Sequence, residues 1–259
     1  MREWPTIDVP EGTLAVGDLH LDVFESDAPR RFRAWCESLQ APHLLILGDL
    51  FEFWVGRHQV DLPGSREVTR GLRDLSDRDV GVDVLWGNRD FLLGRPFEQA
   101  SGARVFPRGV RCLPAGESGE AVPGTLFIHG DELCSADRTY QRMRAVLRFA
   151  PLRALQSSLP LALQLRMAGA LRTSSARSTA AKAMQEVRMV TETAAALGEA
   201  SQCQTLVCGH AHQWRDESLG ALRWIVLDAW GGPRDAVHLC DGRWEGVSSG
   251  CEQGAAGLR

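Results

Sequence analysis

The chain of 259 residues is long enough for one large α/β domain, or for such a domain with a sizeable insertion. Hydrophobic residues make up 44% and charged residues 24%, the balance of an ordinary globular protein. The formal net charge of −4 creates no basic field that would attract nucleic acid, so we expect no nucleic-acid partner.

Features that the sequence lacks predict the compartment of the protein. The N-terminal residues lack an apolar stretch of signal-peptide length. No run reaches the roughly 18 uncharged apolar residues that a membrane-spanning helix needs. Seven cysteines, an odd number, show neither a paired zinc-ligand spacing nor a secretory context. We therefore expect a protein of the reducing cytosol, and the sequence leaves its oligomeric state open.

Strand and helix patterns alternate along the chain. Short apolar runs that end in polar residues predict buried strands at 13–17, 43–48, 82–86, 125–128 and 204–208. Amphipathic patterns predict helices at 28–40 and 65–78. Polar residues at the carboxyl ends of strands match the place where open α/β sheets bind ligands. The late segments are expected to form an antiparallel meander that closes the sheet: 222–227, 236–239 and 243–247.

The composition shifts between the last two of the five predicted strands. Residues 140–197 contain no strand pattern and are rich in Leu, Ala, Met and Arg, so we predict several helices, interrupted at Pro151 and Pro160. This segment is longer than a crossover between strands needs, which indicates a helical insertion, or lid. We divide the chain into a core at 1–136 and 201–247, a helical lid at 137–200 and a flexible tail at 248–259.

Candidate metal ligands follow the predicted strands. They occur in five segments: Gly17-Asp18-Leu19-His20, Gly48-Asp49, Gly87-Asn88-Arg89-Asp90, His129 and Gly209-His210-Ala211-His212. Together these segments supply two Asp, one Asn and four His, which suit two bridged divalent ions. A single Gly-Asp after a strand is usually a turn, and a single His-x-His usually binds nothing. It is the ordered set that indicates a dinuclear site.

Each ligand has an expected place in that site. Asp49 is expected to bridge the ions, because the two oxygens of one carboxylate can bind ions about 4 Å apart. Asp18 and His20 would chelate the first ion, to which His212 also returns. The remaining ligands are assigned to the second ion: Asn88, His129 and His210. Neutral imidazole and amide ligands leave the ions strongly Lewis acidic, which lowers the pKa of bound water towards neutrality.

This ordered set resembles the motifs of the calcineurin-like metallophosphoesterases, which are Asp-x-His, Gly-Asp, Gly-Asn-x-Asp, His and Gly-His-x-His. The resemblance implies an α/β fold, a two-sheet αββα sandwich, with a dinuclear Mn, Fe or Zn site, and we expect two Mn²⁺ ions. Segments 48–54, 87–94 and 129–142 resemble more specifically the branch of this family that acts in lipid A synthesis. That resemblance runs from about residue 13 to residue 231.

The branch implies a reaction and a set of residues near the phosphate. It implies hydrolysis of the pyrophosphate of UDP-2,3-diacylglucosamine to UMP and 2,3-diacylglucosamine 1-phosphate, by attack of a hydroxide held by the ions on the α-phosphorus. Asn88, Arg89 and His210 would contact the reacting phosphate. Most members of other branches carry His where this chain has Arg89, and that His is thought to protonate the leaving oxygen.

Arginine changes the chemistry at that position. Its pKa is above about 12, so it cannot act as a general acid near neutral pH, but it pairs with two phosphate oxygens at once. A pyrophosphate leaving group is itself a phosphate and has little need of a proton. Arg89 therefore favours a pyrophosphate substrate, and the alternative is a surface ion pair between Arg89 and Asp90.

The resemblance also implies that the lid contacts the sugar and phosphates of the substrate. The matching positions are Asp137, Tyr140, Arg172, Ser175, Thr179 and Lys182. The last four are spaced so that they share one face of a predicted helix, with Thr179 standing where the family usually has Asn. The alternative interpretation is a solvated basic helix face.

Further basic residues of the lid predict peripheral contact with the cytoplasmic face of an anionic inner membrane. They are Arg144, Arg148, Arg153 and Arg166. Two other functions stay open. Thr179 and Gln213 leave room for a phosphoesterase that acts on another nucleotide or lipid pyrophosphate, and the same fold can serve as a non-catalytic scaffold.

Overall fold

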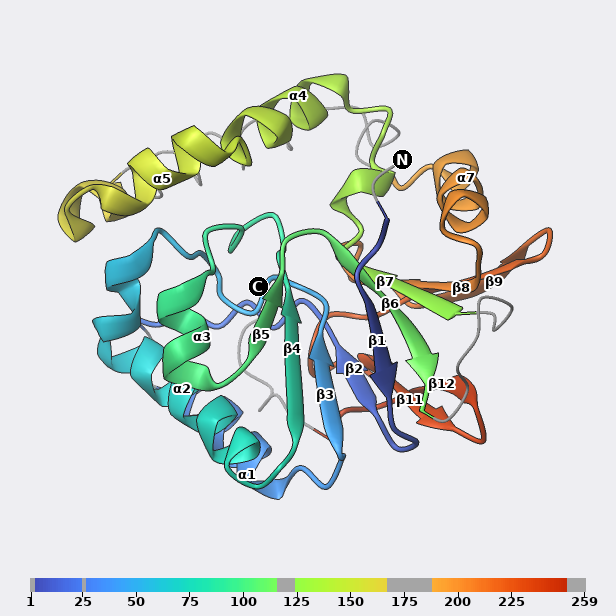
Figure 1. The fold of residues 1–259 in the computed structure, drawn as a ribbon, viewed down its shortest axis with the longest axis horizontal. Helices are drawn as coiled ribbons and strands as arrows, with labels where there is room; N and C mark the ends of the chain where they lie inside the picture. Colours follow the sequence, from blue (N-terminus) through green and yellow to red (C-terminus); the bar gives the residue numbers. More distant parts are fainter. Residues whose placement is uncertain (1–2, 25–26, 116–123, 167–187, 251–259) are drawn as a thin grey trace.

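Two six-stranded β-sheets pack face to face, with helices on their outer faces (Figure 1). The computed structural model describes residues 3–24, 27–115, 124–166 and 188–250. The five strands and two helices predicted above are confirmed, with ends that differ by at most two residues. The predicted α/β two-sheet sandwich is confirmed as well.

The first sheet has the strand order β12-β11-β2-β3-β4-β5. Its strands are β2 (Leu14–Val16), β3 (His43–Ile46), β4 (Gly81–Leu85), β5 (Arg104–Phe106), β11 (Ala236–Cys240) and β12 (Arg243–Val247). Strands β2 to β5 run parallel, and β11 is antiparallel to both β2 and β12. Three helices cover the outer face: α1 (Asp27–Ser38), α2 (Pro63–Ser76) and α3 (Arg95–Ser101).

The second sheet has the strand order β1-β6-β7-β8-β10-β9. Its strands are β1 (Thr6–Val9), β6 (Gly109–Pro114), β7 (Gly124–Ile128), β8 (Cys203–Cys208), β9 (Arg215–Leu219) and β10 (Leu222–Val226). On its outer face, Ala194 of α7 (Thr191–Ser201) and Met189 pack in one buried cluster with Leu206 and Trp224.

Successive residues of the strands pack on opposite faces, as strand geometry requires. In β3, Leu44 and Ile46 pack towards the helices of the first sheet, whereas Leu45 packs towards the second sheet. Phe127 and Val207 of the second sheet meet Leu45 in this inter-sheet core. Each such fully buried side chain contributes about 1.5–3 kcal/mol of transfer free energy, so the core fixes how the sheets lie on each other.

The three late strands form where they were predicted, and β11 and β12 pair antiparallel, but the prediction that all three close one sheet as a meander is wrong. Strand β10 pairs with β8 and β9 in the second sheet, whereas β11 and β12 belong to the first sheet. Residues 227–235 cross between the sheets, which an apolar pattern does not reveal. Strand β9 was missed because its sequence, Arg-Asp-Glu-Ser-Leu, is polar and mostly exposed, so it carries no alternating apolar signal.

The predicted lid contributes helices to two places. Helices α4 (Arg138–Leu147) and α5 (Ala150–Ser158) run across the end of the molecule towards which β3 and β4 point (Figure 1). Helix α7 instead lies against β8 and β10. At the predicted tail, the backbone N–H and the hydroxyl of Ser249 donate to Asp235, and residues 251–259 lie outside the described part. Within the described ranges, every helix is too short or too polar to cross a bilayer.

Candidate metal centre

The seven predicted ligands lie where strands of both sheets end. Asp18 and His20 follow β2, Asp49 follows β3 and Asn88 follows β4, all in the first sheet. From the second sheet, His129 follows β7, and the pair His210 and His212 follows β8. The site is therefore assembled from two sheets, at the end of the sandwich that carries the carboxyl termini of these five strands.

Five of the seven ligands adopt a left-handed backbone conformation, which non-glycine residues seldom do. Their φ angles are 55° at Asp18, 48° at His20, 49° at Asp49, 67° at His210 and 52° at His212. Such a conformation costs about 1–3 kcal/mol at each residue and tends to gather at functional sites. The chain thus bends sharply just after each of these strands. The sequence motifs mark these turns but not their handedness.

Glycines of the motifs let neighbouring ligand loops approach closely. A Cβ atom at Gly87 would collide with the carboxylate of Asp49, and one at Gly209 would collide with the carboxylate of Asp18. The Gly-Asn and Gly-His motifs therefore have a steric reason: each glycine makes room for an acidic ligand of another loop.

The first group of ligand atoms comes from Asp18, His20 and His212, which lie close enough to share one ion. The Nε2 atoms of His20 and His212 face each other at 3.1 Å, and His212 Nε2 lies 3.7 Å from Asp18 Oδ1. The other oxygen of Asp18 accepts the backbone N–H of His210 at 2.6 Å. This group matches the residues assigned to the first ion.

A second group comes from Asp18, Asp49 and His129. Asp49 Oδ2 lies 3.7 Å from His129 Nε2 and 3.9 Å from His20 Nδ1, so it stands between the residues assigned to the two ions. Asn88 Oδ1 lies 2.8 Å from His129 Nε2 and 3.1 Å from His210 Nδ1. The structure thus brings all seven predicted ligands into one cluster.

The donor atoms in this cluster suit cations. The Nδ1 atom of His129 lies 3.0 Å from the carbonyl oxygen of Leu47 and donates there, and in the neutral form that a metal ligand must have, Nε2 turns its lone pair towards Asn88 Oδ1. Two acceptors then face each other, which a cation between or beside them would satisfy. Asp18 Oδ1 is likewise buried without a hydrogen-bond partner among the described residues. The site has the composition and geometry to hold two divalent ions.

The electrostatics of the cluster agree with this interpretation. Burial raises the pKa of Asp49 to about 7, although His129 opposes the shift. Burial would lower the pKa of His129, but the carboxylates of Asp49 and Asp18 outweigh it and raise the value to about 9. Buried carboxylates thus draw a positive charge into the centre, and bound divalent ions would supply that charge.

Comparison with known proteins places the chain in a family. No family model matches it. A UDP-2,3-diacylglucosamine hydrolase of Edwardsiella ictaluri is 36% identical over 226 residues, which cover 84% of this chain and 84% of that protein. The corresponding hydrolase of Shewanella sp. (strain MR-4) is 35% identical over 204 residues, 78% of this chain and 82% of that protein. The chain belongs to the UDP-2,3-diacylglucosamine hydrolase family.

Among solved structures, a dimetal phosphatase of Danio rerio aligns over 92% of this chain and 96% of that one, with 12% identity and a TM-score of 0.45. Family membership and the ligand cluster together make the chain a metal-dependent phosphoesterase.

Arg89 of this family member lies at the edge of the centre. Its Nη1 donates to Glu52 Oε1 at 2.6 Å, its Nε lies 3.6 Å from Asp49 Oδ2, and its side chain remains 39% exposed. The alternative ion pair with Asp90 is wrong, because that buried carboxylate accepts the backbone N–H groups of Gly87 and Leu50, both at 2.8 Å. Glu52, which the sequence did not single out, therefore holds Arg89 beside the bridging position.

The lid residues of the hydrolase family pattern fall into two sets. Arg172, Ser175, Thr179 and Lys182 lie outside the described residues. The Asp137 carboxylate caps α4 by accepting the N–H of Tyr140 at 2.9 Å, and the Tyr140 hydroxyl donates to Asp131 at 2.8 Å. Their contact with a substrate stays a prediction.

Three arginines expected at a membrane surface point into the protein instead. Arg144 and Arg148 lie 2.6 Å and 3.3 Å from Asp131, and the Arg153 guanidinium stacks over Trp86 at 4.4 Å. The expectation for these three is wrong, because a buried carboxylate and an aromatic ring attract them more strongly than solvent does. The spacing of Tyr140, Arg144 and Arg148, four residues apart, is a signal that could have indicated a shared helix face.

Proposed function

We propose that this chain hydrolyses the pyrophosphate of UDP-2,3-diacylglucosamine, releasing UMP and 2,3-diacylglucosamine 1-phosphate. The observation that carries the proposal is Arg89, half-exposed beside Asp49 at the position next to Asn88. A guanidinium cannot protonate a leaving group near neutral pH, but it neutralises phosphate charge. That combination suits the cleavage of a pyrophosphate, and the names of the relatives agree with it.

The residues divide the work between holding ions and holding phosphate. Two divalent ions, for which we propose Mn²⁺, would activate water and neutralise phosphoryl oxygens when bound. Asp18, His20, Asp49 and His212 would hold one side of the pair, and Asn88, His129 and His210 the other. Arg89, fixed by Glu52, would face the charge that develops on the phosphate. Asn88 and His210, which would hold the second ion, would contact the same phosphate.

Arg89→Ala is expected to lower kcat about 100- to 1,000-fold, since it removes a preorganised donor to the developing charge. Arg89→Lys keeps the charge but loses the planar pair of donors, so it should recover only part of the rate. Steady-state kinetics at saturating Mn²⁺ would measure both. Near wild-type kcat for Arg89→Ala would refute this role.

The function is tested by incubating the purified chain and Mn²⁺ with UDP-2,3-diacylglucosamine and quantifying UMP by chromatography. We expect UMP from this substrate and none from deacylated UDP-glucosamine. Equal release from both, or hydrolysis of a cyclic nucleotide alone, would instead favour the alternative phosphoesterase. A folded, Mn²⁺-loaded chain that cleaves no phosphoester would favour a scaffold.

We further propose peripheral contact of the lid with an anionic membrane. Val146, Phe149 and Leu155 of the α4–α5 segment are 58%, 62% and 60% exposed, and Arg166 is exposed nearby. Apolar side chains beside a basic residue suit an interfacial position. Co-sedimentation with vesicles of anionic phospholipid should fall with salt and in a variant with Ser at the three apolar positions. Binding that is absent, or unchanged by these substitutions, would refute the contact.

A further inference from the structure

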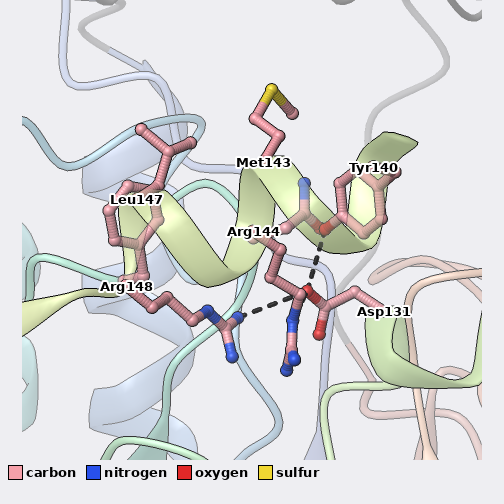
Figure 2. Close-up of a pocket in the computed structure, with 8 residues that line it drawn as sticks. Asp131, Tyr140, Met143, Arg144, Leu147 and Arg148 are labelled. Carbon is pink, nitrogen blue, oxygen red and sulfur yellow. Dashed lines mark hydrogen bonds and ion pairs between the residues drawn. The ribbon is translucent and has the colours of Figure 1, made fainter. Parts of the chain in front are cut away.

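A buried carboxylate joins helix α4 to the metal centre. Asp131 follows His129 by two residues in a short 3₁₀ turn (Asp131–Leu133) and is fully buried. Its Oδ2 atom accepts from the Tyr140 hydroxyl at 2.8 Å, from Arg144 Nε at 2.6 Å and from Arg148 Nη2 at 3.3 Å. Figure 2 shows Tyr140, Arg144 and Arg148 converging on this carboxylate. The helix is thereby fixed to a ligand-bearing loop of the second sheet.

Arg148 extends this connection to the first sheet. Its Nη2 also donates to the carbonyl oxygen of Gly87 at 2.9 Å, and Gly87 directly precedes the ligand Asn88. The Arg148 side chain is only 13% exposed. A small pocket separates α4 from this loop, lined by Asn88, Phe91 and Met143 together with the residues around Asp131 (Figure 2). One guanidinium thus contacts the ligand loops of both sheets.

The other hydrogen-bonding group of Gly87 is also occupied. Its N–H donates to Asp90 Oδ1 at 2.8 Å, while its carbonyl oxygen accepts from Arg148. The peptide planes on either side of Gly87 are therefore both restrained, one by the core and one by the lid. A glycine has the greatest backbone freedom of any residue, so these two hydrogen bonds restrict the backbone that carries Asn88.

We infer that Arg148 is a positioning residue that aims Asn88 at the second ion and so couples the seating of α4 to metal binding. The inference rests on the proposed function in one respect, that Asn88 ligates a metal ion. Groups that orient metal ligands typically change metal affinity about 10- to 100-fold when they are removed. Arg148 has the geometry of such a group, because it holds the peptide that carries the ligand.

The test is a calorimetric titration of the metal-free chain with Mn²⁺, without substrate. Wild type is expected to bind two equivalents. In Arg148→Met, one equivalent should bind about 10- to 100-fold more weakly while the other keeps its affinity. Arg148→Lys, whose ammonium still donates to the Gly87 carbonyl, should lie between the two. Arg142→Gln, at an exposed position of the same helix, is the matched control and should behave as wild type.

Turnover provides a second readout. The activity that Arg148→Met loses should return as the Mn²⁺ concentration is raised. If Arg148 only bound substrate, its removal would instead raise KM at every Mn²⁺ concentration. Two equivalents of unchanged affinity in Arg148→Met would overturn the inference, even if its Tm falls. Should that variant fail to fold, Arg148→Ala, which likewise has no side-chain donor, takes its place with the same expectation. If wild type binds two Mn²⁺ ions but releases no UMP, the proposed function fails while this inference stands.

Discussion

Asp49→Ala is expected to lower Mn²⁺-dependent kcat by about a thousandfold or more, which corresponds to about 4 kcal/mol of transition-state stabilisation. The physical reason is the place of this carboxylate between the two groups of ligands, 3.7 Å from His129 and 3.9 Å from His20. Without it, the carboxylate that would join the residues proposed to hold the two ions is lost. Steady-state kinetics at saturating Mn²⁺, together with metal analysis of the variant, would measure the loss.

The same variant should keep its fold. Because burial raises the pKa of Asp49 to about 7, its ionised form is disfavoured in the folded metal-free protein. We therefore expect metal-free Asp49→Ala to be at least as stable as the metal-free wild type in urea. Near-normal turnover under saturating Mn²⁺ would contradict the assignment of Asp49 as bridge, and a large loss of stability would make the activity result uninformative about metal binding.

Asp83→Asn should have the largest effect on stability, about 3 kcal/mol. This carboxylate is fully buried in β4 and joins the neighbouring strands β3 and β5. It lies 2.9 Å from His43 Nε2, and Arg104 donates to both of its oxygens at 2.7 Å. The value is at the lower end for a broken buried pair, since the Arg104 side chain is 62% exposed and water can solvate it. Urea denaturation at pH 7 with a chelator present would measure it.

The pH dependence of this effect has a definite sign. Burial alone would raise the pKa of Asp83, but hydrogen bonds from His43 and Arg104 outweigh it and hold the pKa below the usual value of 3.8. A lowered carboxyl pKa stabilises the fold above that usual value, and the contribution disappears as pH falls below it. The difference between wild type and Asp83→Asn should therefore shrink as pH falls below about 4.

Asp216→Asn is the matched control, because Asp216 also accepts two hydrogen bonds from an arginine, at 2.9 and 2.8 Å from Arg223, but at the surface. An exposed pair of this kind contributes less than about 1 kcal/mol. Equal losses of unfolding free energy in the two variants would mean that burial adds nothing to the Asp83 network, and would contradict the predicted difference.

The parts of the fold that the sequence predicts are those in which burial leaves an apolar trace. Strand β3 is buried along its whole length and reads as His-Leu-Leu-Ile, so its position was evident. Strand β9 is exposed and polar, and the assignment of β10 and β11 to different sheets depends on where a loop crosses, which no periodicity encodes. Local patterns thus predict the elements better than their pairing.

The candidate site also has a part that the sequence predicts and a part that it does not. The clustering of the seven predicted ligands could be anticipated because each comes just after an apolar run, and the carboxyl ends of these strands lie at one end of the sandwich. Contacts between polar side chains that are distant in the sequence could not be predicted. The contacts of Glu52 with Arg89 and of Asp131 with Arg148 depend on how the lid and the loops pack. Polar residues in such places look like surface residues in the sequence.

The division of the ligands between two sheets has a consequence for the unfolding of the whole protein. One sheet carries Asp18, Asp49 and Asn88, and the other carries His129, His210 and His212. Bound ions would therefore cross-link the two sheets at one end of the sandwich. The sheets could not part there without releasing metal, so bound ions would add to the free energy that separates the folded from the unfolded chain. The stability of this end of the sandwich would then depend on free metal concentration as well as on temperature.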